Sequence, residues 1–170
     1  MSAAPPESRR FYGADGNWTA VDGQYYAFHT TPALSVPAEF TPEFAINGTA
    51  RKWDGKTNMW ASDPRQPLPQ WLELDLGKPQ TFTAVYLTFD TNMAPRLPTE
   101  ACPPEAVRDC QIQVERPEGG WRTVADVKGN FLRHRIHRFA AVTAQRLRVK
   151  ALATNGASEA RIFEVRVYNE

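Results

Sequence analysis

The segment from Trp71 to Leu76 constrains the fold more than any other part of this sequence. Its residues alternate between apolar positions and mainly polar ones, with Leu72, Leu74 and Leu76 set between Trp71, Glu73 and Asp75. Successive side chains of a β-strand point to opposite faces of a sheet, so the pattern predicts a half-buried strand whose three leucines face a core. The turn residues Gly77-Lys78-Pro79 and a second apolar stretch up to Asp90 follow. The pair predicts two consecutive strands.

The rest of the chain has the pattern of further strands separated by turns. Strands are expected over residues 110–115, 121–127, 131–139, 145–153 and 160–168, with an early one near 44–47. Gly129-Asn130 predicts a two-residue hairpin loop between the strands at 121–127 and 131–139, because glycine suits the first central position of a type II′ turn. The sequence therefore predicts an all-β fold, an antiparallel β-sandwich of jelly-roll type with about eight strands. Its core is expected to contain the inward-facing apolar residues Leu72, Leu74, Leu76, Leu147, Val149, Val165 and Val167.

Composition limits the functions open to the chain. It has 170 residues, of which 42% are hydrophobic and 23% charged, as in an ordinary soluble globular domain. A formal net charge of +1 argues against a dedicated nucleic-acid-binding protein, which needs an excess of positive charge. No apolar run approaches the roughly 20 residues of a membrane span, and the first ten residues lack a hydrophobic signal core.

Three elements of the central region occur in a characteristic order. The Trp60-Ala61-Ser62 element is followed by Gln70-Trp71-Leu72-Glu73-Leu74-Asp75-Leu76-Gly77 and then by a strand that opens on an apolar run. This order resembles the coagulation factor 5/8 type C (discoidin-like) domains and the galactose-binding-like carbohydrate modules. The segment 160–168 is similar to the closing strand of that family. The resemblance implies a galactose-binding-like sandwich over residues 44–170 that binds a ligand and is not an enzyme.

Residues 1–43 differ in character from the rest of the chain. They begin with a proline-containing stretch and continue with aromatic residues such as Trp18, Tyr25 and Phe28. We expect this segment to be an extension that packs on the sandwich, or a linker that contacts an attached domain.

Motifs for catalysis are mostly absent from the sequence. It has no nucleophile elbow, no phosphate-binding glycine loop and no His-Glu-x-x-His zinc motif. His134 and His137 are three residues apart on an expected strand, so they are predicted to point to opposite faces. A small hydrolase that assembles a site from Asp90, His134 and a loop serine is a distant alternative.

Calcium is the one cofactor that the resemblance implies. Related modules hold a structural calcium between the loop after the first strand and the last strand, and Asn47 and Glu164 are at similar positions. Asp54 is a further oxygen donor, and oxygen ligands are what calcium prefers. The chain has Asn47 where the family often has aspartate. The alternative is that Glu164 pairs with an arginine such as Arg51 or Arg161.

A sugar site needs aromatic rings beside planar polar side chains, because the apolar face of a sugar stacks on a ring while its hydroxyls form hydrogen bonds. In the resembling modules, loops at one end of the sandwich supply these groups. Candidates at the ends of the expected strands are Asp90, Asn92, Arg108, Asn130, Arg133, Asn155 and Trp53. Several have a structural alternative, since turns also favour asparagine and Arg108 can pair with Asp109.

A basic surface and a cysteine pair leave two further alternatives. Basic residues alternate over 133–137 and again over 146–150, so two adjacent strands would form a ladder for an anionic polysaccharide. We favour a solvated outer face balanced by carboxylates on flanking strands, because like charges opposite each other are unfavourable. Cys110 is expected as a buried thiol, with a disulfide to Cys102 as the alternative.

We therefore expect a noncatalytic carbohydrate-binding module that binds a glycan or polysaccharide. It is expected to be an accessory domain of a larger bacterial extracellular enzyme or oxidoreductase, secreted as part of that protein. The alternative is a structural or protein-interaction domain that keeps the sandwich without a sugar site.

Overall fold

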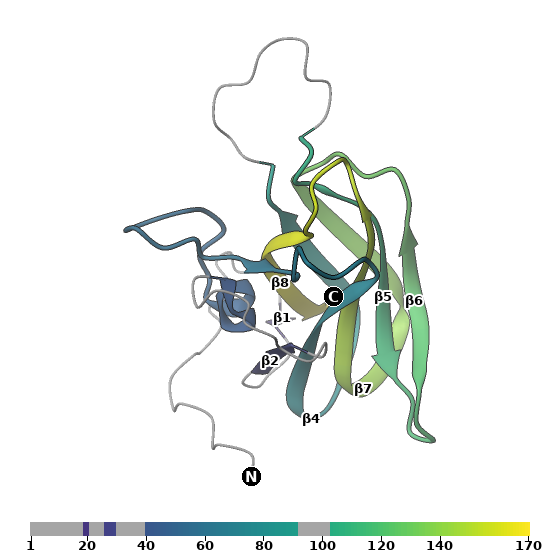
Figure 1. Cartoon of the computed structure of the whole chain (residues 1–170). Helices are drawn as coiled ribbons and strands as arrows, with labels where there is room; N and C mark the ends of the chain where they lie inside the picture. The colour runs from purple at the N-terminus through teal and green to yellow at the C-terminus, as the bar shows by residue number, and fades with distance from the viewer. Residues whose placement is uncertain (1–18, 21–25, 30–39, 92–102) are drawn as a thin grey trace.

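The structure is a computed structural model that describes residues 19–20, 26–29, 40–91 and 103–170. These residues form an all-β fold with one short 3₁₀ helix (Figure 1). The strands are β1 (Thr19–Ala20), β2 (Tyr26–His29), β3 (Trp60–Ala61), β4 (Gln70–Phe89), β5 (Val107–Glu115), β6 (Trp121–Val127), β7 (His134–Thr154) and β8 (Arg161–Asn169), and the helix is η2 (Pro42–Ile46). The predicted antiparallel β-sandwich is confirmed.

The main hydrogen-bonded path contains six strands in the order β1-β8-β4-β7-β5-β6. The short strands β2 and β3 pair with β4 and β8 off this path. Two long strands build both layers of the sandwich. Residues 70–75 of β4 pair with 146–151 of β7, and residues 84–88 pair with 134–138. Figure 1 shows β4 and β7 curving round at the lower edge of the view, so each strand contributes to both sheets.

The continuity of β4 and β7 corrects the sequence-based division of the chain. The expected strands at 71–76 and 80–90 are one strand, as are those at 131–139 and 145–153. Gly77, with φ 77°, bends β4 while the ladder to β7 resumes at Gln80. The early strand at 44–47 is also wrong, because Pro42 opens the 3₁₀ helix η2 there.

The predicted hairpin at Gly129-Asn130 is wrong as well. β6 pairs with β5, and β5 separates it from β7 in the sheet. The connection crosses the start of β5, where the backbone N–H of Asn130 donates to the carbonyl oxygen of Arg108 at 2.8 Å. Local turn chemistry was correct in placing a glycine at positive φ, but it did not determine which strand came next to β6.

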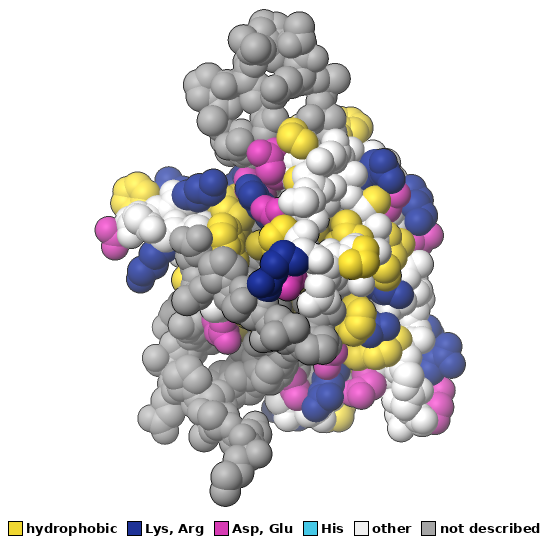
Figure 2. All heavy atoms as spheres, in the orientation of Figure 1, with side chains coloured by type: hydrophobic (Ala, Val, Ile, Leu, Met, Phe, Trp, Pro, Cys, Tyr) yellow, Lys and Arg dark blue, Asp and Glu magenta, His cyan; other side chains and the backbone are white. Residues whose placement is uncertain are grey.

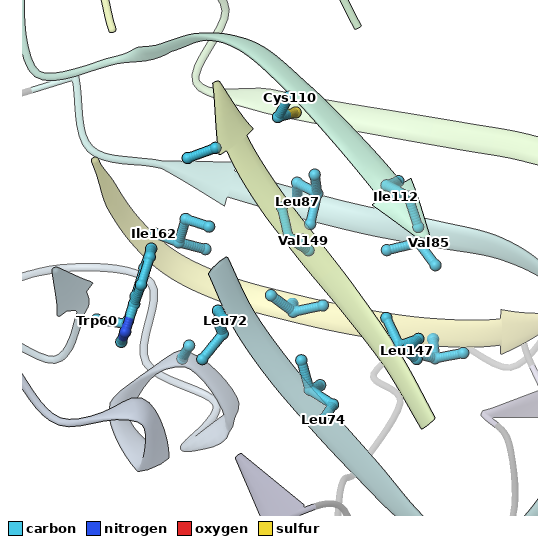
Figure 3. Close-up of a cluster of buried hydrophobic side chains, with 14 of the residues drawn as sticks. Trp60, Leu72, Leu74, Val85, Leu87, Cys110, Ile112, Leu147, Val149 and Ile162 are labelled. Atoms are coloured by element: carbon cyan, nitrogen blue, oxygen red, sulfur yellow. The ribbon is translucent and has the colours of Figure 1, made fainter. Parts of the chain in front are cut away.

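The core lies between the two layers and contains the apolar residues that the alternation predicts (Figure 3). Every predicted member is buried in one cluster, namely Leu72, Leu74, Leu76, Leu147, Val149, Val165 and Val167. Figure 3 labels Leu72, Leu74, Leu147 and Val149 among them. Cys110 joins this cluster as a free thiol, and burial raises its pKa to about 12. The buried-thiol prediction therefore holds for Cys110, while Cys102 lies outside the described residues.

Two pieces of the N-terminal segment add short strands to the sandwich. Residues 19–20 pair with 168–169 of β8, and residues 26–29 pair with 72–75 of β4. The division into an extension over 1–43 and a sandwich over 44–170 stays a prediction, because most of that segment lies outside the described residues. Among those described, no helix is long and apolar enough to cross a membrane.

Candidate functional site

Several loops meet at one end of the sandwich, at the top of Figure 1. Backbone hydrogen bonds join them: Asn155 N donates to Ala106 O at 3.1 Å, and Ala157 N donates to Pro104 O at 2.9 Å. Five of the predicted sugar-site residues lie on these loops or at the adjoining strand ends, namely Asp90, Arg108, Asn130, Arg133 and Asn155. Trp53 lies on a neighbouring hairpin, and Asn92 is outside the described residues.

Asn130 and Asn155 connect the loops from the inside. The Asn130 side chain is buried, and its Nδ2 donates to Val107 O at 2.8 Å and Leu132 O at 3.2 Å. Its Oδ1 accepts from Leu132 N at 3.1 Å. Asn155 Nδ2 donates to Asn130 O at 2.8 Å and to Ala106 O at 3.1 Å. These bonds support the alternative that the two asparagines shape the loops.

Arg133 joins three parts of the chain at this end. Its guanidinium lies 4.8 Å from the centre of the Phe163 ring in β8. Nη1 donates to Phe89 O at 3.4 Å, at the end of β4, and Nη2 donates to Ala50 O in the loop after η2. Because the side chain is half-buried and held on several sides, it presents a positive charge in a fixed position.

Asp90 is a buried ion-pair partner. Its carboxylate is 1% exposed, and Oδ2 lies 3.3 Å from Arg161 Nη1. Burial disfavours the charged form of Arg161, but its bonds to Glu159 and Asp90 outweigh that effect and raise its pKa. The hydrolase alternative required Asp90 and His134 to act with a serine, whereas the structure places His134 Nδ1 3.2 Å from Thr88 Oγ1.

Arg108 forms the local ion pair that the sequence left open. Its Nη2 lies 3.2 Å from Asp109 Oδ2, and about half of the arginine side chain remains exposed. The other carboxylate oxygen of Asp109 accepts from Gly129 N at 2.9 Å. This hydrogen bond and the pairing with Arg108 lower the pKa of Asp109. The pair therefore fixes the β6–β7 loop and still exposes part of Arg108.

Exposed apolar side chains lie on the same loop end and on the neighbouring hairpin. Trp53 is 61% exposed, while Phe131 is 60% and Leu132 45% exposed at the tip of the β6–β7 loop. Trp53 is a predicted member of the sugar site, but sequence reasoning did not single out Leu132. It also missed Phe163, whose role under Arg133 depends on contact between β8 and a distant loop.

Trp53 is carried by a tight hairpin. The backbone groups of Trp53 and Lys56 exchange hydrogen bonds of 3.1 and 3.0 Å, and the intervening Asp54 and Gly55 have φ 52° and 68°. Two consecutive positive φ values are typical of a type I′ turn, which aspartate and glycine favour. The Arg51 guanidinium lies 4.6 Å from the Trp53 ring centre. The hairpin projects from the left side of Figures 1 and 2, where basic and hydrophobic side chains meet.

The side chains of the three predicted calcium ligands lie in different environments. Glu164 Oε1 accepts from Arg166 Nη2 at 2.6 Å, so an arginine partner exists, although it is neither Arg51 nor Arg161. Asp54 lies at the exposed hairpin tip, and Asn47 Nδ2 donates to the side chain of Asn58 at 2.9 Å. Within the described ranges, no cluster of three or more His, Cys, Asp or Glu residues is assembled. The residues present do not fit a calcium site built from these three side chains.

The alternative of a basic ladder across two adjacent strands is wrong in its geometry. The two runs of basic residues belong to one strand, β7, and each pairs with a different half of β4. Arg146 lies 3.7 Å from Glu73 and 3.3 Å from Asp75. Arg148 sits between the rings of Trp71 and Trp121, at 4.9 and 4.2 Å from their centres. The outer face is therefore balanced by carboxylates and aromatic rings.

The two nearby histidines point to opposite faces, as predicted. His134 is exposed and packs edge-on against Tyr86, with ring centres 5.8 Å apart. His137 is 9% exposed, and burial lowers its pKa to about 4, with a smaller contribution from Arg135. His137 is therefore uncharged at neutral pH.

Comparison with solved structures identifies carbohydrate-binding modules with the same fold. The family 32 module of Clostridium perfringens NanJ, in complex with galactose, is 21% identical, with 85% of this chain and 93% of that chain covered and a TM-score of 0.64. The family 32 module of Streptococcus pneumoniae EndoD is 18% identical, with 89% and 100% covered and a TM-score of 0.70. A chitosan-binding module of a Paenibacillus sp. IK-5 chitosanase/glucanase, in complex with chitotriose, is 22% identical, with 88% and 98% covered and a TM-score of 0.64.

At these identities the likeness establishes the fold and leaves the ligand open. A comparison with curated proteins finds no match. The sequence model of the F5/8 type C domains described as "NedA-like, galactose-binding domain" matches residues 44–149, more than half of the chain. Together with the sandwich topology, this match shows that the chain belongs to the F5/8 type C family, among its NedA-like galactose-binding domains.

Proposed function

We propose that this domain is a noncatalytic carbohydrate-binding module whose site is the loop end that carries Arg133 and Phe131, together with the neighbouring hairpin that carries Trp53. The observation that carries the proposal is the exposure of Trp53, 61% of which faces solvent on a hydrogen-bonded hairpin, while Arg133 is bonded to Ala50 O in the loop that leads to this hairpin. Large exposed aromatics on a rigid support are what a sugar-stacking platform requires. The fold shared with family 32 modules supports the same function.

The site combines stacking surfaces with oriented polar groups. The Trp53 ring offers an apolar plane, and Phe131 with Leu132 offers a second apolar surface on another loop. Arg133 supplies N–H donors that backbone carbonyls already orient, so little side-chain entropy is lost when a sugar hydroxyl or carboxylate binds. In this proposal the site is supported by side chains that are bonded within the protein, those of Asn130, Asn155 and Asp90. Arg108 contributes the exposed half of its side chain at the rim of the site.

The charge of the hairpin favours an acidic sugar unit. Arg51, Lys52 and Lys56 are exposed on it, against the single carboxylate of Asp54. The sugars in complex with similar modules differ widely, from galactose and chitotriose to a 4,5-unsaturated mannuronic acid, so the fold alone does not determine which sugar binds. Exposed cations near a stacking platform attract a uronic acid more strongly than a neutral sugar. We therefore propose a uronic-acid-containing glycan as the preferred ligand class.

We also propose that the domain acts as an accessory part of a larger extracellular enzyme. A weak site on such a module raises the effective concentration of an attached catalytic unit near its polymer. This role explains why a shallow site is sufficient. Single-site dissociation constants on the order of 0.1 to 1 mM are expected, because shallow contacts must offset the entropy of association.

A glycan array probed with the full chain tests the proposal. Neutral and uronic-acid-containing glycans should be included, followed by titration calorimetry of the best ligand. Trp53→Ala should weaken binding, while the control Ile136→Ala removes an exposed apolar side chain from β7 and should leave affinity unchanged. If no glycan binds, the protein-interaction alternative becomes the better account of exposed Trp53, Phe131 and Leu132.

A further inference from the structure

The hairpin that carries Trp53 is hydrogen-bonded to the buried side-chain amide of Asn58. Asn58 is 5% exposed, and its Nδ2 donates to the carbonyl oxygens of Arg51 at 3.1 Å and Trp53 at 3.4 Å. Both carbonyls lie on the segment that enters the hairpin and carries the exposed tryptophan. Asn58 itself has φ 50°, a left-handed conformation that asparagine and aspartate adopt more readily than most residues.

The orientation of this amide is determined by its neighbours. The backbone N–H of Thr49 donates to Asn47 Oδ1 at 2.8 Å, which fixes the oxygen side of Asn47. The Nδ2 group of Asn47 therefore faces away from Thr49, and it donates to Asn58 Oδ1 at 2.9 Å. The oxygen of Asn58 is thereby fixed as well, so its NH₂ group faces the two carbonyls. These hydrogen bonds are all consistent with one orientation of each of the two amides.

Converging backbone carbonyls and side-chain oxygens are the groups that hold a calcium ion in other proteins. Asn47, one of the residues that the family resemblance assigns to calcium, belongs to this cluster, yet an N–H donor occupies the position facing the carbonyls. We propose that the Asn58 amide does here what a bound cation does, binding both carbonyl oxygens and fixing the hairpin without a metal. That the hairpin then presents Trp53 to a sugar rests on the proposed function, whereas the stability effect does not.

This proposal predicts that one isosteric substitution creates a dependence on calcium. In Asn58→Asp the side chain keeps its shape and its acceptor for Asn47 but replaces the donor with an oxygen that faces Arg51 O and Trp53 O. The three oxygens repel one another unless a cation lies between them. The wild-type protein, which has the amide donor, should be indifferent to calcium.

Thermal unfolding of chelator-treated protein tests the proposal. In chelator, Asn58→Asp should melt roughly 5 °C or more below wild type, because a buried hydrogen-bonded group has been replaced by an unpaired charge. Millimolar calcium should restore much of the loss by binding the native state, and magnesium should restore less. Wild type and the exposed control Asn169→Asp should change by less than about 1 °C in calcium.

Three results would overturn the proposal. Calcium could raise the melting temperature of the wild type, which would show a resident cation site. Asn58→Asp could be as stable as wild type in chelator, which would remove any need for the amide donor. Asn58→Asp could also be destabilised without recovery in calcium, which would refute the equivalence between amide and cation.

A second variant covers the case in which Asn58→Asp does not fold in chelator. Asn58→Gly keeps the positive φ without strain and removes the amide, so it should lower the melting temperature and show no response to calcium. Wild-type stability in this variant would contradict the proposal. A wild-type protein that bound no glycan would refute the proposed function alone, since none of these melting measurements depends on a sugar.

Discussion

The Trp53 hairpin and the β6–β7 loop are built alike, and they differ in what they present to solvent. In both, a buried asparagine donates to backbone carbonyls: Asn58 to Arg51 O and Trp53 O, and Asn130 to Val107 O and Leu132 O. The hairpin projects from the sandwich and exposes one aromatic ring among cations. The β6–β7 loop crosses the start of β5 and exposes two apolar side chains beside a half-buried arginine.

The comparison separates residues that build the loop end from residues that face solvent. Asn130 and Asp90 are each 1% exposed and are bonded within the protein. Trp53 and Phe131 are largely exposed. Substitutions in the first group should act on stability, and substitutions in the second should act on ligand binding. The following predictions test that division, beginning with the largest expected effect.

Asn130→Ala should lower the free energy of unfolding by about 3 kcal/mol, because it leaves Val107 O and Leu132 N without buried partners. Urea denaturation measures this loss. Asn169→Ala, at an exposed position, should have an effect within about 0.5 kcal/mol. An Asn130→Ala protein as stable as wild type would break the division, since the asparagine would then be free to serve the ligand.

His137 should make stability depend on pH. Its pKa is about 4 in the folded protein, lowered by burial, and near 6.5 when unfolded, so the unfolded chain binds more protons between these values. Stability from this group is complete above about pH 6.5 and falls as pH decreases towards 4, by roughly 2 kcal/mol at pH 5.

Urea denaturation at pH 7 and pH 5 measures the His137 contribution. The loss should shrink in His137→Gln, while His134→Gln, in which an exposed histidine is replaced, should retain it. An equal loss in His137→Gln and wild type would show that other groups are responsible.

Trp53→Ala should weaken glycan binding by about tenfold, which corresponds to about 1.4 kcal/mol, through loss of the stacking surface. The melting temperature should hardly change, because the side chain is mostly exposed. Calorimetric titration of the best array ligand measures the affinity. A variant that loses stability and keeps its affinity would reverse the roles assigned to the two groups.

The smallest effect concerns charge on the hairpin. Lys52→Gln combined with Lys56→Gln should weaken binding of a uronic-acid-containing glycan by roughly threefold, since exposed charges interact weakly across solvent. Binding of a neutral glycan should not change. The difference in affinity between the acidic and the neutral glycan should also become smaller at high salt. Equal affinities of the wild type for acidic and neutral glycans would refute the acidic ligand class and leave carbohydrate binding intact.

The sequence by itself determined the class of fold, the core and the family. The alternation of Leu72, Leu74 and Leu76 predicted a core face, because the side-chain period of a strand is a local property of the backbone. The same reasoning identified Val165 and Val167 in the last strand. Turn chemistry also located the loops, and it identified asparagines as residues that turns require.

Only the tertiary structure decided the order of the strands and which residues at the loop end face solvent and which support the loops. Whether β6 lies beside β7 or across β5, and whether Asn130 faces a ligand or Val107 O, depends on which distant segments meet. An asparagine in a loop has the same local preferences in either role. One partner of Asn130 is the Val107 carbonyl oxygen, which belongs to a distant part of the sequence and comes within hydrogen-bonding distance only when the sandwich closes around its core.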